Sequence, residues 1–182
     1  MRLQREDERK LRELILYISQ KCATDPTFGA TKLNKILFFA DFLAYANLGK
    51  AITNFDYQKL PQGPAPRRLV PVRDQMIADG ELVIQQVRLL RGNVQKRTVN
   101  LRPPDLAIFS GDEIALVDEV IEALEGAKAE AVSELTHRML GWKLVDEGES
   151  IPYNTIFLSN EPLTEAEIQR GRELAKLFDL FA

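Results

Sequence analysis

The chain has 182 residues, of which 45% are hydrophobic and 28% are charged, and its formal net charge is −3. This composition excludes a low-complexity or disordered chain, and the length predicts one domain, residues 1–182, with a substantial core. The only cysteine is Cys22, so an intramolecular disulfide is excluded and a reducing, cytoplasmic location is expected.

The first predicted helix covers residues 6–22. Its apolar positions recur at helical spacing, at Leu11, Leu14, Ile15, Ile18 and Cys22. Pro26 disfavours helical backbone at Asp25 and so ends this helix. Residues 1–10 are highly charged and lack the apolar segment of a signal peptide, so no signal peptide is expected.

The second predicted helix covers residues 31–47 and carries apolar residues on most of its surface, including four aromatic residues: Phe38, Phe39, Phe42 and Tyr45. We therefore expect it to be the central helix of the fold, ending at Gly49. Asp41 interrupts the apolar run 36–46, which is too short to cross a bilayer, so no membrane partner is expected. A buried carboxylate at this position would need a hydrogen-bonding or cationic partner.

The middle of the chain predicts turns, a helix and a hairpin. Residues 51–66 read as extended chain and turns because three prolines and Gly63 forbid a regular helix. A helix is expected over 68–79, with Pro71 in its first turn. Two strand-like runs, 81–90 and 94–102, flank a turn at 91–93 and predict a β-hairpin, with a bulge in its first strand.

Three further helices are expected in the last part of the chain. One begins after Ser110, where Glu113 completes a capping box, and a second covers about 128–140. The third begins after Thr164, where Glu167 repeats the capping-box pattern. The predicted fold class is therefore α+β and predominantly helical, with about six helices around helix 31–47 and one hairpin at 81–102. A helix followed by a hairpin is winged-helix-like in part.

The residue types needed for catalysis or metal binding are scarce. His137 and Cys22 are the only histidine and the only cysteine, which excludes a zinc site built from such ligands. No phosphate-binding loop, dinucleotide fingerprint or serine-nucleophile motif is present. A magnesium or calcium site built from carboxylates alone stays open, although no EF-hand pattern occurs. We therefore expect no catalytic residues, no metal and no cofactor, and a protein that is not an enzyme.

Charge is distributed unevenly along the chain. Residues 59–102 carry 9 basic and 3 acidic residues, a net of +6, whereas residues 103–182 carry 6 basic and 17 acidic residues, a net of −11. Such asymmetry indicates contact with a partner. A winged-helix reading would place phosphates near Arg67, Arg68 and Arg73 and along a wing with Arg88, Arg91, Lys96, Arg97 and Arg102.

A protein partner is nevertheless favoured over nucleic acid. The total charge is acidic, and Asp74 and Asp79 lie on the same predicted helix. This helix also offers few Asn, Gln or Ser side chains that could read bases, Gln75 being the exception. DNA binding is therefore kept as the alternative function.

Four segments resemble one protein family. Residues 31–42, TKLNKILFFADF, resemble the KLNKLLYFADF signature of the Panacea domain, the SocA-like antitoxin family, whose members are also described as phage-associated proteins. Residues 60–66, LPQGPAP, resemble its GP-centred turn. Leu135-Thr136-His137 with Trp142-Lys143 resembles its "SH…W" segment, although Thr136 stands where the family more often has serine. Residues 151–153, IPY, resemble its closing segment, so the resemblance spans about 10–158.

The resemblance implies a non-enzymatic role. Proteins of this family are antitoxins that neutralise a toxin encoded beside them by direct binding, and one type acts as an adaptor that hands its toxin to a protease. The same domain pairs with many unrelated toxins, so it does not fix the partner. The resemblance implies a partner-binding surface around Lys35, Phe39, Asp41, Tyr57, Gln62, Gly63, Pro64, His137 and Trp142.

Overall fold

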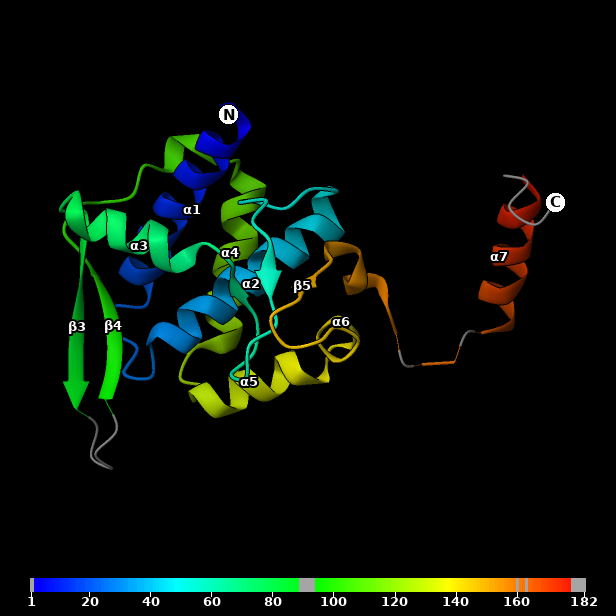
Figure 1. Cartoon of the computed structure of the whole chain (residues 1–182). Helices are drawn as coiled ribbons and strands as arrows, with labels where there is room; N and C mark the ends of the chain where they lie inside the picture. Colours follow the sequence, from blue (N-terminus) through cyan, green and yellow to red (C-terminus); the bar gives the residue numbers. More distant parts are fainter. Residues whose placement is uncertain (1, 89–93, 160, 163, 178–182) are drawn as a thin grey trace.

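Two long helices form the centre of the computed structural model, which describes residues 2–88, 94–159, 161–162 and 164–177. Helix α1 (Arg2–Lys21) begins before the predicted start at residue 6, and α2 (Ala30–Leu48) covers almost the predicted range. Figure 1 shows the other elements of the body arranged around these two helices. Gly49 ends α2 in the left-handed conformation, at φ 75°, as its position predicted.

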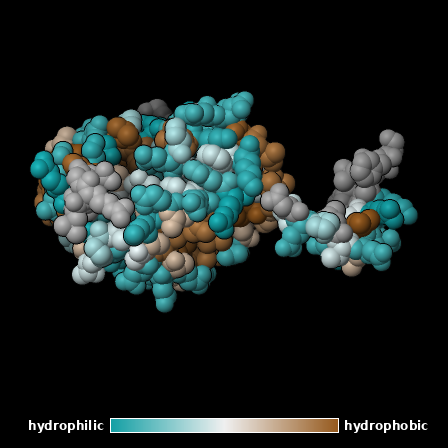
Figure 2. All heavy atoms as spheres, turned by 90° about the horizontal axis from the view of Figure 1, so that it is seen from below, coloured by the Kyte–Doolittle hydropathy of each residue, from teal (hydrophilic) through white to brown (hydrophobic). Residues whose placement is uncertain are grey.

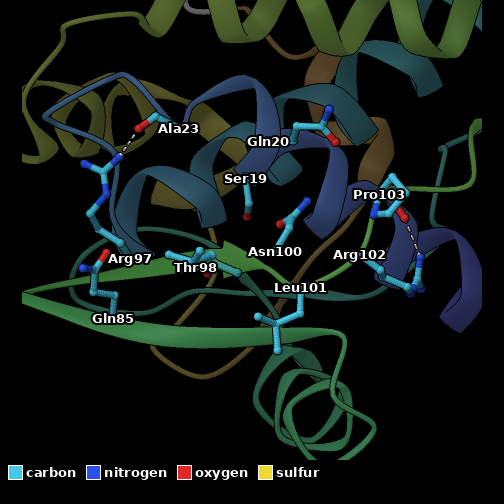
Figure 3. A pocket seen from close by; sticks show the side chains of 11 residues that line it. Ser19, Gln20, Ala23, Gln85, Arg97, Thr98, Asn100, Leu101, Arg102 and Pro103 are labelled. Atoms are coloured by element: carbon cyan, nitrogen blue, oxygen red, sulfur yellow. Dashed lines mark hydrogen bonds between the residues drawn. The ribbon is translucent and has the colours of Figure 1, made fainter.

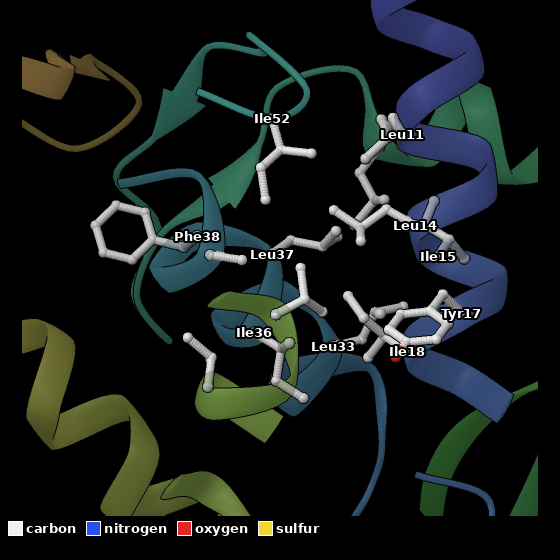
Figure 4. Packing of buried hydrophobic residues seen from close by; sticks show 14 of the residues in the cluster. Leu11, Leu14, Ile15, Tyr17, Ile18, Leu33, Ile36, Leu37, Phe38 and Ile52 are labelled. Carbon is white, nitrogen blue, oxygen red and sulfur yellow. The ribbon is translucent and has the colours of Figure 1, made fainter. Parts of the chain in front are cut away.

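The core is built where α1 and α2 face each other. Leu14, Ile15 and Ile18 of α1 are fully buried and point toward α2 (Figure 4). Ile36 and Leu37 of α2, also fully buried, meet them. The helical spacing of these apolar residues is what gives each helix a continuous buried face. The prediction that α2 is central is confirmed.

The Gly-Pro turn is held in a small sheet. Strands β1 (Tyr57–Gln58) and β2 (Ala65–Pro66) pair antiparallel, and β5 (Ser150–Ile151) pairs with the other side of β1. The sequence predicted extended chain and turns for 51–66 but not the pairing with residues 150–151. The sheet joins the turn to a distant segment that contains the IPY motif.

The predicted helix followed by a β-hairpin is also confirmed. Helix α3 (Leu69–Ala78) is followed by strands β3 (Leu82–Arg88) and β4 (Val94–Asn100), which form a hairpin. The register runs without interruption from Leu82↔Asn100 to Arg88↔Val94, so the predicted bulge is wrong in the described pairs. Residues 89–93, including Arg91 and the predicted turn, lie outside the described residues.

The remaining helices surround α2 or follow the body. The 3₁₀ helix η1 (Leu106–Ile108) leads into α4 (Gly111–Leu124), whose capping box between Ser110 and Glu113 is present as predicted. The predicted helix 128–140 is divided into α5 (Ala129–Arg138) and α6 (Leu140–Lys143), because Met139 leaves the helical region. The 3₁₀ helix η2 (Tyr153–Phe157) precedes α7 (Glu165–Leu177).

Helix α7 lies apart from the other elements (Figure 1). Figure 2 shows α7 as a mostly hydrophilic unit and hydrophobic atoms at the surface where the body meets the segment that leads to it. Phe157 and Leu158, which lie in that segment, are strongly exposed. The seven α-helices and two small antiparallel sheets of the described residues confirm the predominantly helical α+β class.

No helix among the described residues combines the length and apolar character needed to cross a membrane.

Candidate functional site

Lys35 is buried and holds the Gly-Pro turn from the first half of α2. Its side chain is 1% exposed, and its Nζ donates hydrogen bonds to the carbonyls of Gln62 at 2.5 Å and Pro64 at 3.4 Å. Within the described part of the chain, no carboxylate forms an ion pair with it. Burial lowers the pKa of Lys35 to about 8. Lys35 therefore positions the turn and is not itself part of the surface.

Position 63 of this turn requires a glycine. Its φ is 98°, in the left-handed region that favours glycine. A Cβ atom here would also overlap with the side chains of Lys35 and Thr136. The amide of Gly63 donates to the carbonyl of Leu60 at 2.7 Å, which closes the turn. Both Gly63 and Pro64 are buried, so they shape the turn from inside.

Gln62 is an exposed residue of the turn, as is Pro61, and it connects the turn to α2 and α5. The Ser133 hydroxyl of α5 donates to its carbonyl at 3.0 Å, and the Thr31 hydroxyl of α2 donates to its side-chain oxygen at 3.3 Å. Sequence reasoning missed Thr31 and Ser133 as site residues. Thr31 directly precedes the KLNK motif, and Ser133 precedes His137 by one helical turn, so the positions of both residues in the sequence pointed to the site.

His137 and Trp142 form a stacked pair beside the turn. Their ring centroids are 4.1 Å apart with an interplanar angle of 23°. Lys59, another residue that sequence reasoning missed, has its Nζ 4.2 Å from the Trp142 centroid and donates to the Val145 carbonyl at 2.8 Å. Burial, together with the nearby charge of Lys35, lowers the pKa of His137, so its imidazole is neutral at neutral pH.

A hollow of about 520 Å³ lies beside Gln62 and His137. The start of α2, the Gly-Pro turn, α5 and the start of β4 contribute its lining, which includes Thr31, Gln62, Ser133, His137, Gln95 and Lys96. We call this the α2–α5 hollow. Three segments that are far apart in the sequence, 31–35, 60–66 and 135–142, meet at its wall. Its lining offers hydroxyls, amides, two lysines and a glutamate, which suits recognition of a polar surface.

Asp41 and Tyr57 do not lie on this surface, because both are buried. Asp41 is fully buried and accepts hydrogen bonds from the Thr53 amide at 2.8 Å, the Thr53 hydroxyl and the Tyr57 hydroxyl at 2.8 Å. Burial raises the pKa of Asp41, although these donors oppose the effect. The predicted need for a hydrogen-bonding partner is met by Thr53 and Tyr57. The two residues stabilise the far end of α2 from inside.

The aromatic members of the predicted surface are partly buried. Phe39 packs against the core and lies edge-on to Phe38, with centroids 5.5 Å apart. Trp142 also packs against the core on one side. Of the nine predicted partner-binding residues, Gln62, Phe39, His137 and Trp142 have exposed parts.

Most residues predicted to contact nucleic acid bind other parts of the chain. Arg97 donates to the carbonyls of Asp25 at 2.8 Å and Ala23 at 3.0 Å, at the end of α1. Arg67 donates to the Gly148 carbonyl at 2.8 Å. Arg102 forms ion pairs with Glu13 and Glu81, both at 2.7 Å. Longer ion pairs, both at 3.7 Å, join Arg68 to Glu8 and Arg73 to Asp74. Arg88 and Lys96 are exposed, and Arg91 lies outside the described residues.

Other centres of chemistry are not apparent in the described residues. Cys22 is buried, and burial raises the pKa of its thiol to about 11. Among the residues that the structure describes, no group of three or more His, Cys, Asp or Glu side chains could hold a metal ion.

Comparison with known proteins yields one family. A family model described as antitoxin SocA-like, Panacea domain, matches residues 33–143, more than half of the chain. The matched range includes the Gly-Pro turn, α5 and the His137–Trp142 pair. No curated protein and no solved structure matches the chain.

Proposed function

Because the chain belongs to the SocA-like antitoxin family with a Panacea domain, we propose that it is a cytoplasmic, non-enzymatic protein that binds a cognate toxin by direct contact and neutralises it. The observation that carries this proposal is the meeting of three family-like segments at the α2–α5 hollow. Residues that are distant in sequence and yet converge on one surface are typical of a binding site.

The hollow is supported from inside, which favours binding. Lys35 holds the turn from below, and the left-handed Gly63 fixes its shape. Gln62 is in turn held by Ser133. A surface that is already ordered loses little conformational entropy when a partner binds. The buried family-like residues therefore position the turn, and the exposed ones, Gln62 and His137 among them, would contact the toxin.

Neutralisation takes one of two forms in this proposal. The bound chain either occludes the toxin's own site or presents the toxin to a protease. The lifetime of the toxin in cells separates the two forms, since only delivery to a protease shortens it.

DNA binding, the alternative function, has weaker support. The outward face of α3 exposes Val70 and Ile77, which offer no hydrogen bonds to base edges. Arg67, Arg97 and Arg102 already donate to carbonyls or carboxylates of this chain. A gel shift with DNA from upstream of the gene at low salt tests this function, because phosphate contacts are strongest there.

Co-expression with the products of neighbouring genes tests the proposed function. We expect one of them to stop growth when expressed alone and to be tolerated when this chain is present. If no neighbouring product is toxic, or if none is neutralised, the proposal is wrong.

Two variants locate the binding surface in the same assay. Ser133→Arg places a long cation in the α2–α5 hollow and should abolish rescue. Ala123→Arg makes the same kind of change on an exposed position of α4 and should leave rescue intact. Rescue by Ser133→Arg at the wild-type level would mean that the toxin binds elsewhere.

A further inference from the structure

Strand β3 has one edge that pairs with no other strand of the described residues. Its seven residues, Leu82–Arg88, pair on one side with β4 in an uninterrupted register. On its other side, Figure 1 shows no further element of the described chain. We call this side the β3 edge. The function proposed above does not use it.

Alternate residues of β3 turn their backbone groups toward this edge. The Leu101 amide donates to the Glu81 carbonyl at 2.8 Å, so the backbone of Glu81 faces β4. Since hydrogen bonds alternate along an antiparallel pair, Ile84 and Gln86 point their N–H and C=O groups away from β4. The same holds for the first and last residues of the strand. Such a row of groups is a template for an added strand.

Strand β3 lacks the features with which proteins protect an edge. It contains no proline and no lysine, and its single charged residue, Arg88, lies at its end. The adjoining face of the hairpin is apolar as well. Figure 3 shows Asn100 directed toward α1 and Leu101 on the other side of the hairpin. On that side Val83 and its cross-strand partner Val99 are 41% and 38% exposed. An edge and a face of this kind indicate a surface that another strand covers.

The sequence of β3 matches that of a second copy in antiparallel orientation. When Gln85 lies opposite Gln85 of the second copy, the outward-facing Ile84 of each strand meets the outward-facing Gln86 of the other. Val83 then lies opposite Val87 on the apolar face, where such pairs stabilise a sheet. The two Gln85 side chains can bond each other, because an amide both donates and accepts.

The position of Arg88 favours the same arrangement. In the antiparallel pair the two Arg88 side chains lie at opposite ends of the strands, about 20 Å apart. A parallel pair would place them side by side, about 5 Å apart, where like charges repel. The charge of β3 is therefore compatible with antiparallel self-pairing and opposes the parallel form.

We propose that the β3 edge joins two copies of this chain into a two-fold symmetric dimer. The two hairpins form one continuous four-stranded sheet in the order β4–β3–β3–β4, with the same residues contributed by each copy. A strand of an unrelated protein would satisfy the backbone equally well, but the pairing of Val83 with Val87 and of Gln85 with itself favours a second copy. Because a single strand pair gives a small interface, the dimer should be weak, with a Kd of about 10 μM.

Sedimentation velocity of the purified full chain tests this proposal. Over a range of about 1–500 μM, which brackets the expected Kd, the mass should rise from that of the 20.6 kDa chain to twice this value. Gln86→Pro removes an outward-facing N–H and leaves the β3–β4 hydrogen bonds in place, so it should give a monomer whose Tm changes by a few degrees at most. Gln86→Ala keeps this N–H and should dimerise like the wild type.

A charge exchange at Gln85 tests the register and does not depend on the proline variant. Gln85 is exposed, so Gln85→Lys and Gln85→Glu should both fold. Each alone places like charges opposite each other and should dimerise about fivefold more weakly than the wild type. An equimolar mixture of the two should regain dimers, because opposite charges then meet.

Three results would overturn the proposal. They are a constant monomer mass over the whole range, a folded Gln86→Pro that dimerises like the wild type, and a mixture of the Gln85 variants that dimerises no better than either alone. None of these measurements contains a toxin, so the dimer and the toxin binding proposed above fail separately.

Discussion

Gly63 is the residue at which the turn is most sensitive to change. An alanine would have to adopt φ 98° and would place its methyl group against Lys35 and Thr136. We expect Gly63→Ala to lower the free energy of unfolding by about 2–4 kcal/mol, measured by urea denaturation, and to abolish toxin neutralisation.

Gly49→Ala is the matched control. Gly49 also has a left-handed backbone, at φ 75°, but a Cβ atom there would meet nothing within 4 Å. Only backbone strain should remain, so the loss should be about 1 kcal/mol. Equal losses in the two variants would show that Lys35 and Thr136 do not confine the turn.

Lys35 gives the stability of the fold a pH dependence of known sign. Burial lowers its pKa from 10.5 to about 8 in the folded state, so between these values the unfolded chain binds more protons. The contribution of Lys35 to stability therefore rises as the pH rises. From about pH 7 to about pH 10, the free energy of unfolding of the wild type should increase by about 2 kcal/mol relative to Lys35→Met. Parallel pH profiles of the two proteins would contradict this.

At the residue scale, the sequence did not show which residues of the predicted surface are buried. Lys35 and Asp41 are charged, and their motif placed them in the predicted surface set, but packing of neighbouring elements buries both. The aromatic neighbours of Asp41 carried the correct signal, since they predicted a partner for a buried carboxylate. Thr31 and Ser133 were missed because their contacts with Gln62 depend on how α2, α5 and the turn meet.

At the scale of elements, the contribution of the α4 capping box to stability can be tested with one substitution. The Ser110 hydroxyl accepts from the Glu113 amide at 3.2 Å, and the Glu113 carboxylate accepts from the Ser110 amide at 2.8 Å. Ser110→Ala should lower the free energy of unfolding by about 1 kcal/mol, seen as a Tm decrease of a few degrees.

Thr164→Ala removes the equivalent cap of α7 and serves as the control. Thr164 accepts from the Glu167 amide at 3.3 Å, but α7 lies apart from the body. The main thermal transition should not move. A shift equal to that of Ser110→Ala would mean that α7 is part of the same cooperative unit.

Helix ends that depend on neighbouring residues were predicted from the sequence, whereas contacts between distant segments were not. The cap of α4 and the glycine end of α2 involve residues within one turn of each other. By contrast, β5 is a strand only because it pairs with β1, about 90 residues earlier. The division between α5 and α6 lies beside Gly141, where a Cβ atom would overlap with Thr155 of η2. Such packing is set by the tertiary fold and overrides a continuous helical pattern.

At the scale of the whole molecule, the prediction of one domain over residues 1–182 awaits a test. Figure 1 shows a body that ends with η2 and a separate α7. We expect a chain that ends after residue 159 to keep its Tm within a few degrees, measured by circular dichroism. A decrease of about 10 °C or more would instead place residues 160–182 in the same cooperative unit.

We propose that this antitoxin-family chain acts by binding a toxin at the α2–α5 hollow. Calorimetric titration of the purified chain with the purified toxic product of a neighbouring gene tests it most directly. We predict saturable binding that is lost in Ser133→Arg and retained in Ala123→Arg. No binding heat with a toxin that the chain neutralises in cells, or equal binding by both variants, would contradict the claim.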